Sequence, residues 1–146
     1  MSTRPLSSET VHASAVAIEG RAVLIGGKSG SGKSDLALRL IDRGGALISD
    51  DYTLVRRSGC EALATAPETI IGKIEARGLG IVEMPAERDV PVGLYVDLDQ
   101  APERLPEPGE TLMIAGLAIP VLRLAGLEAS APIKVELALK SIGLKP

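Results

Sequence analysis

The chain has 146 residues, of which 45% are hydrophobic, so we expect a single domain with a substantial core. This core should be aliphatic, because the chain has two tyrosines and no tryptophan or phenylalanine. The net charge of −3 argues against nucleic acid as the main partner, and no apolar run is long enough to span a membrane. The single Cys60 cannot form an internal disulfide, which fits a reducing cytoplasm, and with one histidine it cannot supply a zinc site.

The first ten residues form a mostly polar segment, which we expect to be loose, ahead of a single domain over residues 11–146. Residues 11–18 predict a strand. Glu19 and Gly20 then predict a tight turn into a second strand. The short connection predicts that the two strands are antiparallel neighbours.

The stretch that follows has the spacing G-x-x-x-x-G-K-S of a phosphate-binding P-loop. An aliphatic run precedes it, as a buried strand would, and apolar residues at helical spacing follow it until Gly44. Glycines let successive backbone N–H groups turn toward a phosphate, and the positive end of the next helix points at the same anion. Lys33 can reach the β- and γ-phosphates, and the Ser34 hydroxyl can hold Mg²⁺. The expected nucleotide site consists of Gly27, Lys28, Ser29, Gly30, Ser31, Gly32, Lys33 and Ser34.

Two adjacent carboxylates, Asp50 and Asp51, follow the strand predicted over residues 46–48. The carboxyl ends of strands border the ligand crevice of an α/β sheet, so both are expected near the phosphates. One can position or deprotonate an attacking hydroxyl and the other can bind Mg²⁺; an Asx turn that ends the strand is the alternative. His12 comes near the phosphates if its strand lies beside the P-loop strand, whereas a surface or core position is the alternative.

The rest of the chain predicts mainly strands. A doubly wound P-loop kinase would instead alternate strand and helix throughout. The expected elements are a hairpin over residues 52–64 that turns at Ser58 and Gly59, a strand-like segment within 73–84, a strand over 90–98, a proline-rich acidic loop over 102–110, two short strands over 112–124 interrupted by Gly116 and Pro120, and a helix that starts at Ser130 and ends before Gly143, with Ile133, Leu137 and Ile142 as its apolar positions.

Four segments together resemble bacterial HPr kinase/phosphorylase: Val11-His12, the P-loop, Ile48-Ser49-Asp50-Asp51 and Ile74-Glu75-Ala76-Arg77-Gly78-Leu79-Gly80-Ile81. The last segment is similar to the family signature, which usually has isoleucine in place of Ala76. The resemblance implies an α/β fold with a P-loop core of the HPr kinase and phosphoenolpyruvate carboxykinase type, rich in strands and with few helices. It further implies a cytoplasmic, homo-oligomeric serine kinase that uses ATP and Mg²⁺ to phosphorylate HPr, the phosphocarrier protein of the phosphotransferase system, and can remove that phosphate with inorganic phosphate.

The resemblance also implies catalytic roles. Asp50 would take the proton from the seryl hydroxyl in the kinase direction and return it in the reverse direction. Asp51 and His12 would shape this site, next to Lys33 and the transferred phosphoryl group. Arg77 would balance phosphate charge or secure the catalytic loop.

The resemblance places Mg²⁺ on Ser34 and Glu75, and the acidic pair adds Asp51 as a further expected ligand. Because the usual amino-terminal domain is absent, the chain resembles the short, catalytic-domain form found in alphaproteobacteria. The family also has a Gly-Arg-Asn stretch where this chain has Ser130-Ala131-Pro132, which predicts a weaker phosphorylase.

Two other functions remain open for a P-loop chain. A small-metabolite kinase of the shikimate or gluconate type also has acidic residues after the P-loop helix, but it needs further helices and an arginine-bearing lid. A nucleotide-binding regulator without catalysis would not need the set Lys33, Ser34, Asp50 and Glu75 intact. Transfer of labelled phosphate from ATP to HPr, to shikimate or to neither distinguishes these functions.

Overall fold

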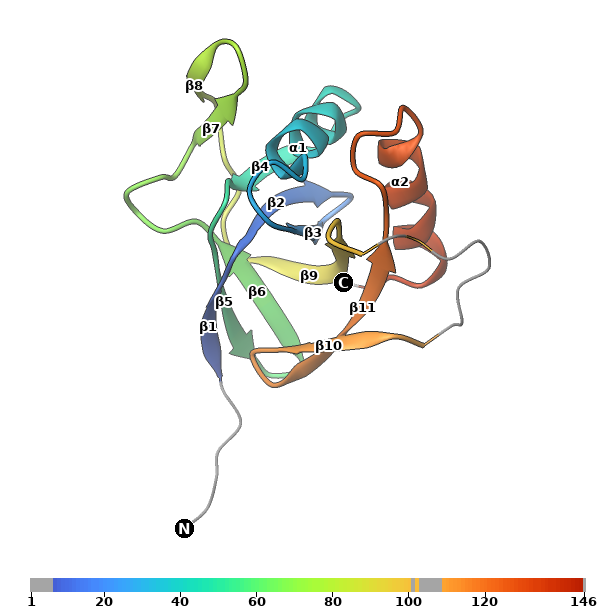
Figure 1. Cartoon of the computed structure of the whole chain (residues 1–146). Coiled ribbons are helices and arrows are strands. Elements are labelled where there is room, and N and C mark those ends of the chain that lie inside the picture. The colour runs from blue at the N-terminus through green and yellow to red at the C-terminus, as the bar shows by residue number, and fades with distance from the viewer. Residues whose placement is uncertain (1–6, 101, 103–108, 146) are drawn as a thin grey trace.

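The computed structural model describes residues 7–100, 102 and 109–145, and Figure 1 labels its elements. In these ranges the chain forms eleven strands and two helices. The strands are β1 (Ser8–Val11), β2 (Ala13–Ile18), β3 (Arg21–Gly26), β4 (Ala46–Ser49), β5 (Thr53–Ser58), β6 (Glu61–Thr65), β7 (Lys73–Ala76), β8 (Gly80–Glu83), β9 (Val90–Asp97), β10 (Thr111–Ile114) and β11 (Leu117–Arg123). The helices are α1 (Lys33–Asp42) and α2 (Ala131–Ser141), and neither is long and apolar enough to cross a membrane.

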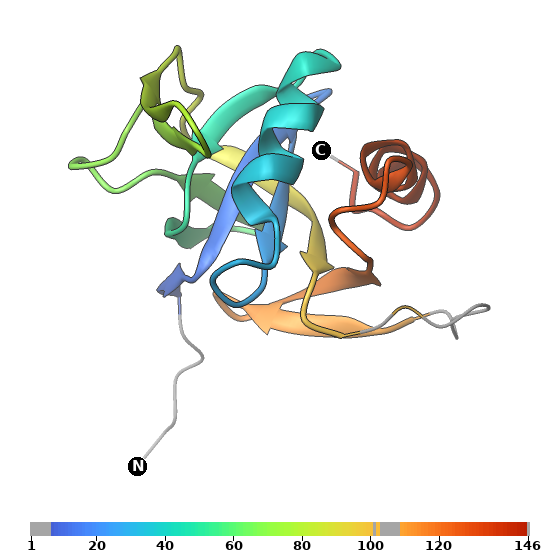
Figure 2. The ribbon, with the colours of Figure 1, turned by 45° about the horizontal axis from the view of Figure 1, so that its top comes forward.

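The central strands β2, β3, β4 and β9 separate two apolar cores. Both helices cover one face of these strands (Figure 2). Residues of β5, β6, β10 and β11 contribute to the core on the other face. Side chains alternate between the two faces of a strand. Val16 and Ile25 accordingly pack in the core under the helices, whereas Ala15 and Leu24 pack in the core between the strand layers.

The sheet brings several strand ends to one edge. As predicted, β2 and β3 are antiparallel neighbours joined at Glu19 and Gly20. β2 is also antiparallel to β4, so β4 runs in the same direction as β3, and β3 is parallel to β9. The carboxyl ends of β3, β4 and β9 therefore meet, together with the start of β2, where Ala13 pairs with Gly26. The P-loop leaves the sheet at this edge.

Most of the predicted elements are confirmed. They include the P-loop helix, the strand that precedes Asp50, the hairpin at Ser58 and Gly59, and the strand over residues 90–98. The segment over 73–84 forms an antiparallel hairpin, β7–β8, that is a separate two-stranded sheet. Of the proline-rich loop expected over 102–110, residues 103–108 lie outside the described ranges.

The amino-terminal prediction is wrong in two details. Ser8, Glu9 and Thr10 are not loose, because with Val11 they form β1 and pair with β5. The strand expected over residues 11–18 is also divided at His12. The bend allows β1 to pair with β5 while β2 pairs with β3 and β4, so the two halves belong to different parts of the sheet.

The carboxyl-terminal half of the structure differs from the prediction at two further places. Pro120 does not interrupt its strand, because the N–H of the next residue, Val121, donates to Glu110 before β10. The nitrogen of Pro120 thus faces the other side, where pairing with β9 starts only at Val121. Helix α2 exists, but its buried side consists of Ala131, Pro132, Val135, Ala138 and Leu139, and the apolar positions used to predict it, Ile133, Leu137 and Ile142, are exposed.

Candidate active site

The P-loop connects β3 to α1 and depends on close approaches that only glycine allows. Gly32 precedes α1 with a φ of 99°, in the left-handed region. A Cβ on Gly26 would lie 1.8 Å from the hydroxyl of Tyr95 on β9. Burial and the carboxylates of Asp97 and Asp99 raise the pKa of the Tyr95 phenol above its ordinary value of 10.0. A neutral phenol thus packs beneath the entry to the loop.

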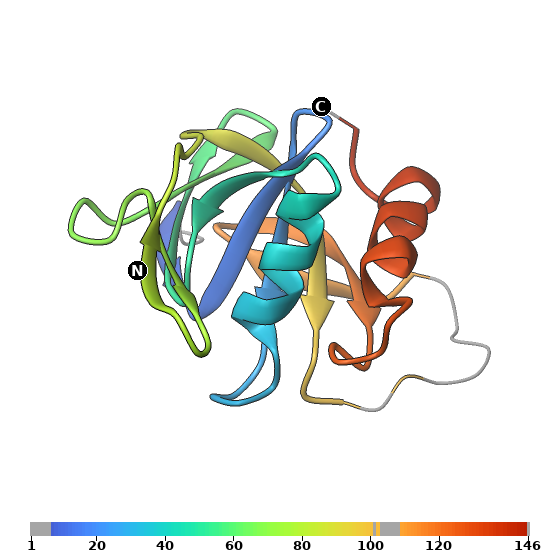
Figure 3. The ribbon, with the colours of Figure 1, turned by 90° about the horizontal axis from the view of Figure 1, so that it is seen from above.

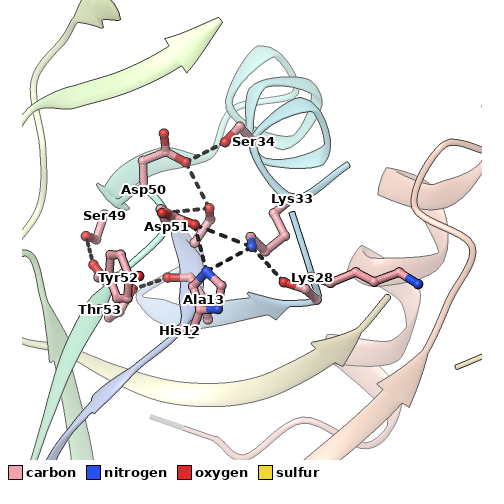
Figure 4. Close-up of polar contacts among 12 residues, drawn as sticks. His12, Ala13, Lys28, Lys33, Ser34, Ser49, Asp50, Asp51, Tyr52 and Thr53 are labelled. Carbon is pink, nitrogen blue, oxygen red and sulfur yellow. Dashed lines mark hydrogen bonds and ion pairs between the residues drawn. The ribbon is translucent and has the colours of Figure 1, made fainter. Parts of the chain in front are cut away.

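Lys33 is buried at the base of the site, with its ammonium directed toward three oxygen or nitrogen atoms (Figure 4). Its Nζ donates to the carbonyl oxygen of Gly27 at 2.6 Å and lies 3.4 Å from Oδ1 of Asp51. It is also 3.3 Å from Nε2 of His12, which is 3.0 Å from the same Asp51 oxygen. A neutral ring cannot donate to Asp51 and accept from Lys33 through one nitrogen, so the tautomer of His12 decides which contact forms.

Asp51 occupies an unusual backbone conformation. Its φ is 67°, and the N–H of Tyr52 donates to the carbonyl oxygen of Asp50 at 2.8 Å across it. The hydroxyl of Ser14 accepts the N–H of Asp51 at 3.0 Å, and Ser49 Oγ donates to the Tyr52 carbonyl oxygen. Non-glycine residues at positive φ cost free energy and are concentrated at functional sites. The turn directs a half-exposed carboxylate at Lys33 and His12.

Asp50, unlike the half-exposed Asp51, is buried and hydrogen-bonded at both carboxylate oxygens. Only 9% of the residue is exposed, and its Oδ1 accepts hydrogen bonds from Ser34 Oγ at 2.6 Å and from Ser14 Oγ at 2.9 Å. Its Oδ2 accepts the backbone N–H of Glu75 at 2.9 Å. This carboxylate therefore links the start of α1, β2 and β7 at the end of β4.

The oxygen ligands available for Mg²⁺ are few. Ser34 and Asp50 lie together, whereas Asp51 is directed at His12 and Lys33, and Glu75 meets Asp50 through its backbone N–H. Among the residues that the structure describes, no group of three or more histidines, cysteines or carboxylates could hold a metal. Mg²⁺ at phosphate sites is bound by one or two protein oxygens together with phosphates and waters. A hydroxyl next to a carboxylate fits this kind of binding.

A cavity of about 560 Å³ joins the P-loop to the β7–β8 hairpin. Asp50, Asp51 and Glu75 border it, and so do Arg77 and Leu79 from the turn of the hairpin. Its volume lies in the range of about 300–1,000 Å³ that is typical of small-ligand pockets. The signature segment and the P-loop, which are far apart in sequence, thus border one cavity.

Four further residues of this region were not predicted from the sequence. Ser14 contacts both aspartates, and the ring of Tyr52 stacks on that of His12 with centroids 4.9 Å apart. Asp99 accepts the N–H of Lys28 at 2.8 Å, and Leu127 lines the cavity. Only Asp99 had a sequence signal, because it follows a strand end as Asp50 does.

Known proteins are similar to this chain over most of its length. Residues 5–87 match the family described as HPr Serine kinase C-terminal domain. An HPr kinase/phosphorylase of Chlorobium phaeobacteroides (strain BS1) is 36% identical over 127 residues, which cover 77% of this chain and 37% of the relative. One from Clostridium botulinum (strain Eklund 17B / Type B) is 42% identical over 80 residues, which cover 54% of this chain and 26% of the relative.

A solved structure agrees as well. The Hpr(Ser) kinase/phosphatase from Coxiella burnetii is 27% identical, with a TM-score of 0.77 over 90% of this chain and 94% of that chain. This match confirms the expected strand-rich α/β fold with few helices. The chain spans little more than a third of the length of the Chlorobium relative. By sequence and by fold, the chain belongs to the HPr serine kinase C-terminal domain family.

Proposed function

We propose that the chain is an ATP-dependent serine kinase that phosphorylates the phosphocarrier protein HPr, with a weaker phosphorolytic activity on phosphoserine-HPr. The observation that carries the proposal is the cluster of Lys33, Asp51 and His12 beside a P-loop, in a chain of this family. Family membership supports ATP as the donor. Cytoplasmic location and homo-oligomeric assembly follow from the same resemblance and stay predictions.

The P-loop residues hold the phosphates in this proposal. Backbone N–H groups of the loop and the amino end of α1 surround the β-phosphate. Lys33, held by the Gly27 carbonyl oxygen, neutralises charge that develops on the transferred phosphoryl group. Mg²⁺, bound through Ser34 and the phosphates, would supply further positive charge to the phosphate oxygens.

We assign the proton acceptor to Asp51 rather than to Asp50, which the family resemblance had implied. Both oxygens of Asp50 already accept hydrogen bonds, and the residue is buried. The Asp51 carboxylate is 52% exposed and lies next to Lys33, so an incoming seryl hydroxyl can reach it. Asp50 then orients Ser34 and supports the metal site, a role that the sequence had given to Asp51.

Two further residues complete the proposed site. His12 lies 3.0 Å from Asp51 and, with its proton on Nε2, donates to that carboxylate. Arg77 lines the cavity and offers a fork of donors that can balance the charge of a second phosphate, as phosphorolysis requires. Lys134 on α2 is a point charge without such a fork, and it pairs with Glu128 at 2.8 Å.

Phosphate transfer from γ-labelled ATP tests the proposal. The chain is incubated with HPr, with HPr whose acceptor serine is replaced by alanine, with shikimate, and without an acceptor. We expect label on HPr alone and none on its alanine variant. Label on shikimate, or nucleotide binding without any transfer, would instead support one of the two alternative functions.

A further inference from the structure

The loop between β11 and α2 holds an exposed leucine against the P-loop. Leu127 is 70% exposed, yet its Cδ2 lies 2.9 Å from the position that a Cβ on Gly32 would take. Leu127 also lines the cavity of the candidate active site. With so little of its side chain buried, Leu127 contributes little to the core and is available to a ligand.

Hydrogen bonds and packing determine the position of this leucine. The guanidinium of Arg39 donates to the carbonyl oxygens of Gly126 and Glu128, the residues on either side of Leu127, the second at 2.8 Å. A Cβ on Gly126 would lie 3.3 Å from the carbonyl oxygen of Ser31 in the P-loop. The loop therefore packs through its backbone on the P-loop, and Arg39 ties it to α1.

The cavity has a transfer end and an opposite end. Asp51 and Lys33 mark the transfer end, and β7–β8 lies on that side because the N–H of Glu75 donates to Asp50. In Figures 1 and 2, and again from above in Figure 3, α2 lies on the other side of α1 from β7–β8. The phosphates of a nucleoside triphosphate form a linear chain, so a γ-phosphate at Asp51 leaves the nucleoside at the far end. Leu127 lines the cavity from the loop that leads into α2.

We propose that Leu127 is the contact surface for the nucleoside part of ATP, and that Arg39 is the positioning residue that holds it there. This inference rests on the proposed kinase function and assigns the donor subsite within it. A leucine offers no hydrogen bond to the edge of a base, so its contribution is apolar contact with the ribose or a base face.

The test compares two triphosphate ligands, one with a nucleoside and one without. Calorimetric titration measures the affinity of the whole chain for the non-hydrolysable ATP analogue AMPPNP and for inorganic tripolyphosphate, each with Mg²⁺. Leu127→Ala should weaken AMPPNP binding about three- to tenfold, the loss expected for part of a leucine contact, and leave tripolyphosphate binding unchanged. Leu127→Met should retain the affinity. Leu137→Ala is the matched control, because Leu137 is 61% exposed and is not among the residues lining the cavity.

Arg39→Ala should produce the same selective loss, since the loop loses two hydrogen bonds. An Arg39→Ala effect of equal size on both ligands would overturn its positioning role. Unchanged AMPPNP binding by Leu127→Ala, or equal weakening of both ligands, would overturn the assignment of Leu127. A wild-type chain that binds neither ligand would contradict the kinase proposal itself, which is a different result.

Discussion

The hydroxyl oxygen of Ser34 lies 2.6 Å from Oδ1 of Asp50, while the neighbouring Asp51 carboxylate contacts His12 and Lys33. Adjacent aspartates thus face different parts of the site. One supports the P-loop hydroxyl from a buried position, and the other is half exposed beside the P-loop lysine.

Asp50→Asn should destabilise the fold as well as impair catalysis. The amide group of asparagine replaces one acceptor oxygen by a donor, next to Ser14, Ser34 and the N–H of Glu75. A buried donor without an acceptor costs about 1–3 kcal/mol. Urea unfolding should show this loss, and the Mg²⁺ concentration for half-maximal kinase activity should rise. Wild-type stability and Mg²⁺ dependence would contradict the bridging role of Asp50.

Lys33→Ala should lower phosphate transfer by about 10²-fold or more, because it removes a charge that stabilises the transferred phosphoryl group. Ser34→Ala should cause a loss of similar order through the metal. Steady-state kinase rates measure both, with circular dichroism to verify the fold. A folded Lys33→Ala chain with near-normal transfer would contradict the P-loop assignment.

Arg77→Ala should damage the reverse reaction more than the forward reaction. Phosphorolysis brings inorganic phosphate next to a phosphoserine, and this second anion needs a cation that the forward reaction does not. The measurement is the rate of HPr dephosphorylation at millimolar phosphate compared with the rate of ATP-dependent phosphorylation. Equal losses in both directions would show that Arg77 supports the site in general.

Tyr95 should make the stability of the chain fall at alkaline pH. Its phenol has a pKa raised in the folded state, first by burial and then by Asp97 and Asp99. The unfolded chain loses this proton at lower pH than the folded chain, so stability is unaffected at neutral pH and falls as the pH rises through about 10. Tyr95→Phe, measured by urea unfolding at several pH values, should remove part of this fall. An identical fall in stability at alkaline pH in both chains would contradict the contribution of Tyr95.

Local patterns in the sequence were sufficient for most of the fold and for the centre of the site. The G-x-x-x-x-G-K-S spacing, the turn at Glu19 and Gly20, and the acidic pair at a strand end each depend on nearby residues. The bend at His12 was not predictable, because it follows from which distant strands β1 and β2 pair with. The buried side of α2 was missed because Val135 and Leu139, together with two alanines and Pro132, are buried, whereas Ile133 and Leu137 are exposed.

The site residues that were missed depend on tertiary contacts. Ser14 and Tyr52 have no motif of their own, and each acts through a residue that was identified, Asp50 or His12. Leu127 lies in a loop whose carbonyl oxygens at Gly126 and Glu128 accept hydrogen bonds from Arg39 of α1, a contact between residues far apart in sequence. The separate surroundings of Asp50 and Asp51 likewise come from β2 and β7, which approach from distant parts of the sequence.

Single-turnover transfer of phosphate from saturating ATP to HPr, by the wild-type chain and by Asp51→Asn, tests the central claim most directly. Asparagine tolerates the positive φ at this position, so the turn should persist and nucleotide affinity should stay close to wild type. We predict that the wild-type chain phosphorylates the HPr serine and that Asp51→Asn does so about 10²–10⁴-fold more slowly, the usual magnitude for a general base. Transfer by Asp51→Asn at the wild-type rate, or a wild-type chain that leaves HPr unmodified, would contradict the account.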